Sequence, residues 1–364
     1  MNSVKTKNHE PLIRVVKKPE MPTSKAVILR IASFVLAIAV GGLFILAIGH
    51  NPFEVYKEMV MGCFRSKIAL QGTVKIIVPL LITSLGVTLA YKMKFWNIGA
   101  EGQMLMGGIF ASYFALFQSD MPHWALLIVS FLAGCIGGAI WGIIPAFFKV
   151  KFGTNETLFT LMLNYIALYI IDFLRHETWR DPGARGFPKI ASFASNARIG
   201  AVFDLQGGWV VALIMVVAVF VLLKYTKFGY EISVVGESQP TARYAGMSVK
   251  KVVILTMALS GAICGSAGMI KAMGSDYTLT LGLADGVGFT AIIVAWLGQL
   301  NPFIILLITI FFSIIEKGSG VIQSTFNISV FTSDVLQGII LFFIIASEFF
   351  TRYSFAFKKG GKSK

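Results

Sequence analysis

Apolar residues along this chain fall in long runs, without the stripes of a surface helix or the alternation of a half-exposed strand. Runs of about 20 residues are long enough to cross a bilayer as helices. The pattern predicts an all-α polytopic membrane protein with about ten transmembrane helices, some of them short or broken. The expected helices cover residues 26–49, 73–91, 103–118, 124–148, 158–175, 208–225, 252–273, 287–300, 302–316 and 333–350.

Composition and charge support a membrane location. The chain is 56% hydrophobic and only 14% charged, whereas a soluble domain is about one quarter charged. The net charge is +14, but the basic residues gather in loops that share one side if there are ten helices. The positive-inside rule then places both termini in the cytoplasm of a bacterial plasma membrane. A nucleic-acid partner would need these bases on one folded face, so we expect none.

The chain divides into a membrane domain with two tails. We expect a cytoplasmic tail over residues 1–25, a transmembrane domain over 26–350 and a basic cytoplasmic tail over 351–364. Within the membrane domain, residues 176–207 are expected to form an external loop and residues 226–251 a cytoplasmic one. The first apolar run is too long for a cleaved signal peptide, so we expect it to be retained.

Sites for a metal, a cofactor or ATP are not indicated. Cys63, Cys135 and Cys264 lack the spacing of a metal site or a disulfide framework. The chain has no Walker motif, so it is not expected to bind ATP in the usual way. The four histidines fall in or near separate loops, which disfavours a membrane-embedded enzyme.

Two polar segments precede expected helices. The run from Asn97 to Gln103 is Asn-Ile-Gly-Ala-Glu-Gly-Gln, in which Asn97 can cap the following helix and Glu101 lies in its first turn. The alternative is a broken helix that lines a transport pathway, with Glu101 or Gln103 facing the cavity. Asn155, before Glu156, is a second candidate helix cap or pathway residue.

Polar residues deeper in the membrane domain extend this candidate pathway. Asn164 and Tyr165 lie within an expected helix, where an asparagine needs either a neighbouring helix or a polar solute as its partner. The loop over residues 276–288 is rich in glycine and contains Asp285. It forms either a flexible connection or a broken helix at a transport site. The interior is nearly free of Lys and Arg, which favours a neutral cargo.

A third polar segment, Gly236 to Gly246, lies in the expected cytoplasmic loop. Pro240 is a favoured first helical residue and Gly246 a natural helix stop. These signals predict a short surface helix suited to docking into a partner protein. Its small residues would be Ala242 and Ala245, and its outward-reaching residues Arg243 and Tyr244.

Glycines at four-residue spacing predict close helix packing. Gly134, Gly138 and Gly142 form one such series, and Gly261 and Gly265 another. Small residues at this spacing let membrane helices approach closely. We expect packing within the subunit, with a moving helix pair at a gate as the alternative.

These segments resemble the permease subunits of ABC importers for branched-chain amino acids, ribose and nucleosides. The similarity covers residues 30–350 and is most distinctive of nucleoside-type permeases. It departs from their pattern at Thr157 and Ala291. The matching runs are Trp96–Gly107, Thr154–Ala167, Gly236–Met247, Leu259–Ala262 and Gly288–Gly298.

The resemblance implies a pathway subunit for nucleosides or a related neutral solute that performs no covalent chemistry. It also implies a second permease subunit, identical or paralogous, a cytoplasmic ATP-binding subunit coupled through Gly236 to Gly246, and an extracytoplasmic substrate-binding lipoprotein. Simple-sugar or branched-chain amino acid transport remain alternatives. A self-sufficient secondary transporter or channel would instead need its own titratable sites, with Glu101, Glu156 and Asp285 as candidates.

Overall fold

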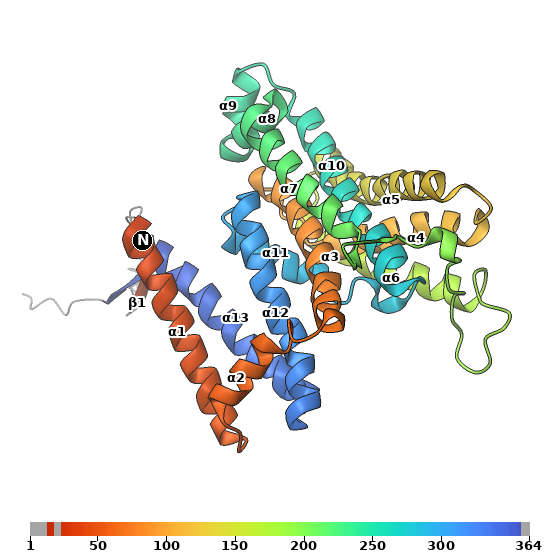
Figure 1. Ribbon diagram of the computed structural model, residues 1–364. Coiled ribbons are helices and arrows are strands. Elements are labelled where there is room, and N and C mark those ends of the chain that lie inside the picture. The colour runs from red at the N-terminus through yellow and green to blue at the C-terminus, as the bar shows by residue number, and fades with distance from the viewer. Residues whose placement is uncertain (1–12, 18–22, 358–364) are drawn as a thin grey trace, which may run out of the picture. The chain divides into compact units, whose positions relative to one another are not determined.

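The computed structural model describes residues 13–17 and 23–357, whose regular structure is helical apart from two short strand pairs and one isolated bridge. Parts of both expected tails, residues 1–12, 18–22 and 358–364, lie outside the described residues. In chain order the elements are β1 (Ile13–Lys17), α1 (Thr23–Ala47), α2 (Pro52–Met61), α3 (Lys67–Lys92), α4 (Ala100–Phe117), α5 (His123–Phe152), α6 (Glu156–His176), η1 (Ser195–Ala197), β2 (Ala201–Val202), β3 (Leu205–Gln206), α7 (Gly208–Tyr225), α8 (Lys227–Glu237), α9 (Gln239–Tyr244), α10 (Val249–Lys271), the π-helix η2 (Ala272–Asp276), η3 (Leu281–Leu283), α11 (Val287–Leu297), α12 (Pro302–Phe326), α13 (Val330–Arg352) and β4 (Tyr353–Phe357) (Figure 1).

A helix stands at each of the ten predicted positions, but fewer than ten are candidates for a full membrane crossing by length and composition. Among the described residues, seven helices are long and apolar enough to cross a membrane, or eight if the bent pair α1–α2 is one span. The pair bends by 114° between Ala47 and Pro52. Of the remaining predicted spans, α4 opens with a polar turn. Helix α11 has 11 residues, which is about 16 Å against a hydrocarbon core of about 30 Å.

The described residues divide into two units, of which the first contains those up to residue 59 and those from residue 319 onward. Here α1 packs against α13 (Figure 1), and β1 pairs with β4 in an antiparallel register that runs from Ile13 opposite Phe357 to Lys17 opposite Tyr353. Helix α2 is tied to α1 by the Tyr56 hydroxyl, which donates to the Ile38 carbonyl at 2.9 Å.

The second unit, residues 60–318, has α10 at its centre, in contact with α3, α4 and α5. The predicted glycine series makes this packing possible. A Cβ on Gly138 would overlap the Gly261 carbonyl, and one on Gly265 would overlap the Gly134 carbonyl. The prediction of close helix packing within the subunit is confirmed.

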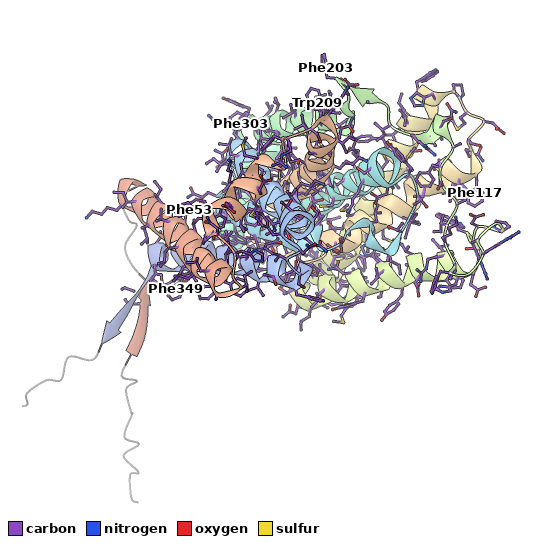
Figure 2. All side chains as sticks on the ribbon, turned by 60° about the horizontal axis from the view of Figure 1, so that its bottom comes forward. Phe53, Phe117, Phe203, Trp209, Phe303 and Phe349 are labelled. Carbon is purple, nitrogen blue, oxygen red and sulfur yellow. The ribbon has the colours of Figure 1, made fainter. Side chains whose placement is uncertain are left out.

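The segment between α6 and α7 is an ordered loop tied to neighbouring elements. The Phe193 amide donates to the Tyr277 carbonyl at 2.8 Å, and the Ile199 amide donates to the Met273 carbonyl at 2.9 Å. The β2–β3 hairpin at its end projects Phe203, which is 85% exposed, away from the helices (Figure 2). The loop is thereby fixed to the end of α10 and the connection that follows it.

Candidate functional site

The break between α3 and α4 is shaped by Asn97. Its Oδ1 accepts a hydrogen bond from the Gly99 amide at 2.9 Å. Helix α4 begins at Ala100, and the residue in the N-cap position is Gly99, which makes no side-chain cap. The prediction that Asn97 caps the helix is wrong by two positions. Its side chain closes the turn before the helix, as asparagine often does by bonding an amide two residues on.

Buried amide side chains join this turn to α6. Asn97, Gln103 and Asn164 are each at most 5% exposed. Asn97 and Gln103 exchange amide hydrogen bonds at 3.3 and 3.4 Å. Asn164 accepts from the Gly102 amide at 2.8 Å and donates to the Ile98 carbonyl at 2.9 Å. Of the two kinds of partner predicted for Asn164, a neighbouring helix or a polar solute, the structure shows the helix. The oxygen and the nitrogen of all three side-chain amides are hydrogen-bonded to protein groups.

Glu101 links the first turn of α4 to the start of α11. Its Oε1 accepts from the Gly286 amide at 2.8 Å and its Oε2 from the Gly288 amide at 2.7 Å. The first amides of a helix have no partner inside it, and a carboxylate there makes strong charge-assisted bonds. Gly288 has no room for a side chain, because a Cβ would lie 2.6 Å from the Glu101 Cα. Glu101 is therefore a clamp between the first turn of α4 and Gly286, which lies 185 residues further along the chain, directly before α11.

The connection that leads into α11 has an unusual backbone. Asp285 has φ of +44° and Gly286 has φ of +79°, the left-handed region that is unfavourable for residues other than glycine. The Asp285 side chain is exposed, although its backbone lies next to the clamp. The glycine-rich loop predicted over residues 276–288 therefore ends in a defined, strained turn.

Charged residues outside the predicted set surround this turn. Lys271 and Asp285 each interact electrostatically with Glu101, Asp276 and Glu316. These side chains come from α4, from the end of α10, from the connection before α11 and from α12. Together they form a mixed cluster in which carboxylates outnumber the lysine.

The expectation of an interior nearly free of lysine needs correction in this region. Lys271 lies in α10, and Lys75, which interacts electrostatically with Asp276, lies in α3. Lys75 also stands over the Tyr277 ring, with Nζ 5.8 Å from its centroid. Both lysines fall inside predicted spans, and an ionisable residue inside a span is by itself a signal of function that could have identified them.

Asn155 and Glu156 both act locally at the start of α6. Asn155 Oδ1 accepts from the Leu158 amide at 3.2 Å, which confirms it as the helix cap. Glu156 forms an ion pair with Lys149 of α5 at 2.6 Å. The two residues close the turn between α5 and α6.

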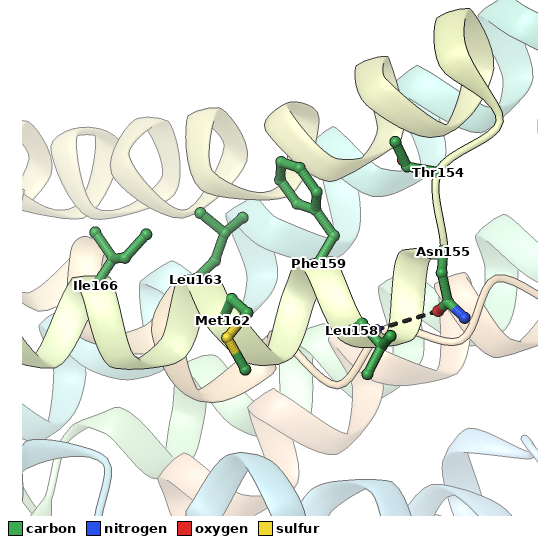
Figure 3. A pocket seen from close by; sticks show the side chains of 7 residues that line it. All are labelled: Thr154, Asn155, Leu158, Phe159, Met162, Leu163 and Ile166. Atoms are coloured by element: carbon green, nitrogen blue, oxygen red, sulfur yellow. Dashed lines mark hydrogen bonds between the residues drawn. The ribbon is translucent and has the colours of Figure 1, made fainter.

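An open groove follows the exposed side of α6 (Figure 3). Its volume is about 470 Å³, and its exposed lining is almost entirely apolar. Tyr165, 53% exposed, lies on the same helix next to this lining. Figure 3 shows the lining residues Thr154, Asn155, Leu158, Phe159, Met162, Leu163 and Ile166.

The predicted surface helix is present as α9, Gln239–Tyr244, within one residue of its expected bounds. Ser238 caps it by accepting from the Thr241 amide at 3.3 Å. Ala242 is buried, whereas Tyr244 is 96% exposed, and Arg243 and Ala245 are exposed as well. The helix is a capped projection with an aromatic ring and a guanidinium on its outer side.

Two glycines define the ends of this segment. Gly246 has φ of +77° and ends the helix turn as predicted. Gly236, near the end of α8, lies directly against the end of α3, because a Cβ there would overlap the Lys92 carbonyl and lie 3.1 Å from the Met93 Cα. The α8–α9 segment is thus in direct backbone contact with the residues that lead to Asn97.

Metal chemistry finds no support in the described part of the chain. No group of three His, Cys, Asp or Glu side chains there could hold a metal ion. Among the described residues, Cys63, Cys135 and Cys264 form no disulfide bond.

Comparison with known proteins identifies the family. Residues 69–345 match the model of the branched-chain amino acid transport system permease component. The match covers more than half of the chain, so the chain belongs to this family of ABC importer permeases. It is a multi-pass membrane protein and a transport component, not an enzyme.

Curated relatives divide between two kinds of solute. The chain is 32% identical to a glucose ABC transporter permease protein of Haloferax volcanii, over 87% of this chain and 86% of the relative. It is 29% identical to a nucleoside ABC transporter permease protein of Lactococcus lactis, over 81% and 84%. It is 30% identical to a guanosine ABC transporter permease protein of Bacillus subtilis, over 73% and 78%.

Proposed function

We propose that this chain forms the membrane pathway of an ATP-driven importer for nucleosides or a related neutral polar solute. The observation that carries the proposal is the contact between the α8–α9 segment and the end of α3, at Gly236 and Lys92. This contact connects a protruding, capped helix to the polar turn at Asn97. An energy source outside the chain could act on the pathway through such a connection.

The proposed route of coupling starts at α9. An ATP-binding subunit on the cytoplasmic side grips Pro240 to Gly246 and hydrolyses ATP, so this chain needs no cofactor of its own. Movement of α9 shifts α8, and Gly236 passes the shift to Lys92 and Met93. The turn at Asn97 follows, and Glu101 carries the shift to α11. Packed elements with two discrete arrangements can transmit a displacement in this way.

The proposed pathway lies beside the α4–α11 junction. It includes Asn97, Glu101, Gln103, Asn155, Glu156, Asn164, Tyr165 and Asp285. The buried amides among them would be released from their present partners as α4 and α11 move, and would then be able to bond hydroxyl or amide groups of a solute. Amide, hydroxyl and carboxylate groups suit an uncharged solute that offers many hydrogen bonds.

Charge around the junction supports a neutral cargo over an anionic one. Lys271 and Lys75 stand against four carboxylates, those of Glu101, Asp276, Asp285 and Glu316. A phosphorylated or carboxylated solute would meet more carboxyl groups than lysines there, and repulsion between like charges is strongest in a medium of low dielectric constant. Nucleosides and simple sugars carry no such charge.

Two curated relatives named for nucleoside or guanosine transport favour nucleosides, and the glucose permease relative makes a simple sugar the second candidate. Radiolabelled guanosine, adenosine, cytidine and glucose uptake into cells expressing the complete importer tests the choice. Saturable nucleoside uptake that excess glucose leaves unchanged supports the proposal. Uptake of glucose alone would replace nucleoside with sugar as the cargo.

The full assembly that we propose sits in the plasma membrane of a bacterium, with both termini of this chain in the cytoplasm. It contains a second permease subunit, the ATP-binding subunit and an extracytoplasmic substrate-binding lipoprotein. Cysteine labelling from either side of the membrane tests the orientation: a thiol placed at Tyr244 should react only from the side where ATP is hydrolysed.

A further inference from the structure

Two grooves adjoin α9. The first, of about 260 Å³, reaches Gln239 and Arg243 of the helix and continues to the end of α3 and the start of α10. The second, of about 530 Å³, begins at Ala245 and Gly246, directly after the helix. Helix α9 is thus a ridge beside two hollows, and Tyr244 is 96% exposed on it.

Among the charged residues that line the two grooves, cations outnumber carboxylates. The first is lined by Lys94, Lys149, Arg243 and Lys250 and by one carboxylate, Glu156. The second is lined by Lys227 and Lys251 and by one carboxylate, Glu231.

Both carboxylates already have a cation as partner. Glu156 pairs with Lys149 at 2.6 Å and Glu231 with Lys227 at 3.9 Å. Among the described residues, the other four cations have no ion-pair partner, and all four are exposed. The unpaired cations are Lys94, Arg243, Lys250 and Lys251.

We propose that the surface which receives α9 is an acidic cleft of the ATP-binding subunit, with carboxylates placed opposite Lys94, Arg243, Lys250 and Lys251. The inference rests on the proposed function and adds the chemistry of the partner. Complementary charge steers encounter and selects between partners, more than it sets the final affinity. The four cations therefore favour binding of this chain's own ATP-binding subunit over binding of paralogous subunits whose clefts are less acidic.

The alternative occupant of a basic surface is an anionic bilayer, but the shape favours a protein. A bilayer surface is flat and needs only a spread of lysines. Here the cations lie along hollows beside a projecting helix that is capped at Ser238 and stopped at Gly246. A cleft with raised acidic edges fits both the ridge and the grooves.

The test measures binding of the purified ATP-binding subunit encoded beside this chain's gene. The complete permease is held in nanodiscs of neutral phosphatidylcholine, and affinity is measured from 50 to 500 mM salt. The test variant is Arg243→Glu with Lys250→Glu. The control is Lys151→Glu with Lys224→Glu, which makes the same change of charge at exposed lysines that line neither groove.

We expect the wild-type affinity to fall with salt, because screening weakens charge pairs as the Debye length shortens. The test variant should bind about tenfold more weakly or worse at 50 mM salt and lose most of the salt dependence, while the control stays close to wild type. If the test variant regains binding when one cleft carboxylate of the ATP-binding subunit is replaced by Lys, that carboxylate faces one of the two substituted positions.

Two results would overturn the inference without touching the proposed function: tight binding that is independent of salt, or equal weakening by the test and control variants. Binding that requires anionic phosphatidylglycerol in the nanodisc would assign the cations to lipid and also overturn it. Absence of any binding by the wild-type permease would instead overturn the proposed function.

Discussion

Replacement of Glu101 by Gln tests the clamp between α4 and α11 most directly. The carboxylate accepts two amide hydrogen bonds, at 2.8 and 2.7 Å. A glutamine keeps one acceptor oxygen but turns an NH₂ group toward the second amide, which then has no acceptor. Hydrogen bonds to a charged group contribute about 1.5–3 kcal/mol each. We therefore expect the docked state of α11 to lose about 2–3 kcal/mol, or roughly 30–150-fold in its population ratio.

Hydrogen exchange of the Gly286 and Gly288 amides measures this loss, because local opening sets the exchange rate. In Glu101→Gln, peptides that cover α11 should exchange about 30–150-fold faster, while peptides from α5 stay protected. Uptake should be lost although the protein is still present in the membrane at normal levels. Glu177→Gln, the same change at an exposed residue, is the matched control and should alter neither measurement.

Two outcomes would refute the reasoning at different steps. Unchanged exchange of α11 in Glu101→Gln would show that the carboxylate is not what holds the helix. Faster exchange with normal uptake would leave the clamp as a structural feature and remove it from the coupling route. Gly288→Ala approaches the same junction from α11, since its Cβ would press on the Glu101 backbone, and should reproduce the exchange result.

Four further substitutions test three other parts of the molecule. Gly138→Leu should abolish recovery of folded protein from the membrane, measured by size-exclusion chromatography, because even a Cβ would overlap the Gly261 carbonyl. Arg243→Glu or Gly246→Val should leave ATP hydrolysis in the complex but uncouple it from uptake; Gly246 has φ of +77°, where a β-branched residue costs about 1–3 kcal/mol. Unchanged uptake in both would remove the docking role of α9. Asn164→Leu strands one amide and one carbonyl and should cost about 2–5 kcal/mol in unfolding free energy; a melting temperature within 1 °C of wild type would contradict this.

Short-range signals predicted the local features of this protein well. The apolar run over residues 208–225 gives α7 the same bounds in the structure, because hydrophobic length alone decides a membrane helix. Asn155 caps α6 and Gly246 ends the α9 turn as expected. In each case the interacting groups lie within a few residues of one another, so the sequence contains the whole interaction.

Long-range partners were beyond the reach of the sequence. The β1–β4 pair joins residues 13–17 to residues 353–357, and nothing local in either segment identifies the other as its partner. Lys75 and Lys271 lay inside predicted spans, but nothing local showed that Asp276 or Glu316 would share their surroundings. The pairing of charges in a membrane protein depends on which helices meet, and that is decided by the packing of the whole unit.

The shortness of α11 and the unpredicted role of Glu101 are physically linked. The first amides of the 11-residue helix α11 have no partner inside the helix, and each amide left unsatisfied in hydrocarbon costs several kcal/mol. Such a helix is stable only if another part of the chain supplies acceptors, and Glu101 supplies two. The polar turn at the start of α4 therefore supplies the hydrogen-bond acceptors that the start of α11 needs. Two sequence features should therefore be considered together as parts of one junction. The first is a carboxylate in a glycine-rich break, and the second is a distant glycine-rich loop that precedes a short apolar run.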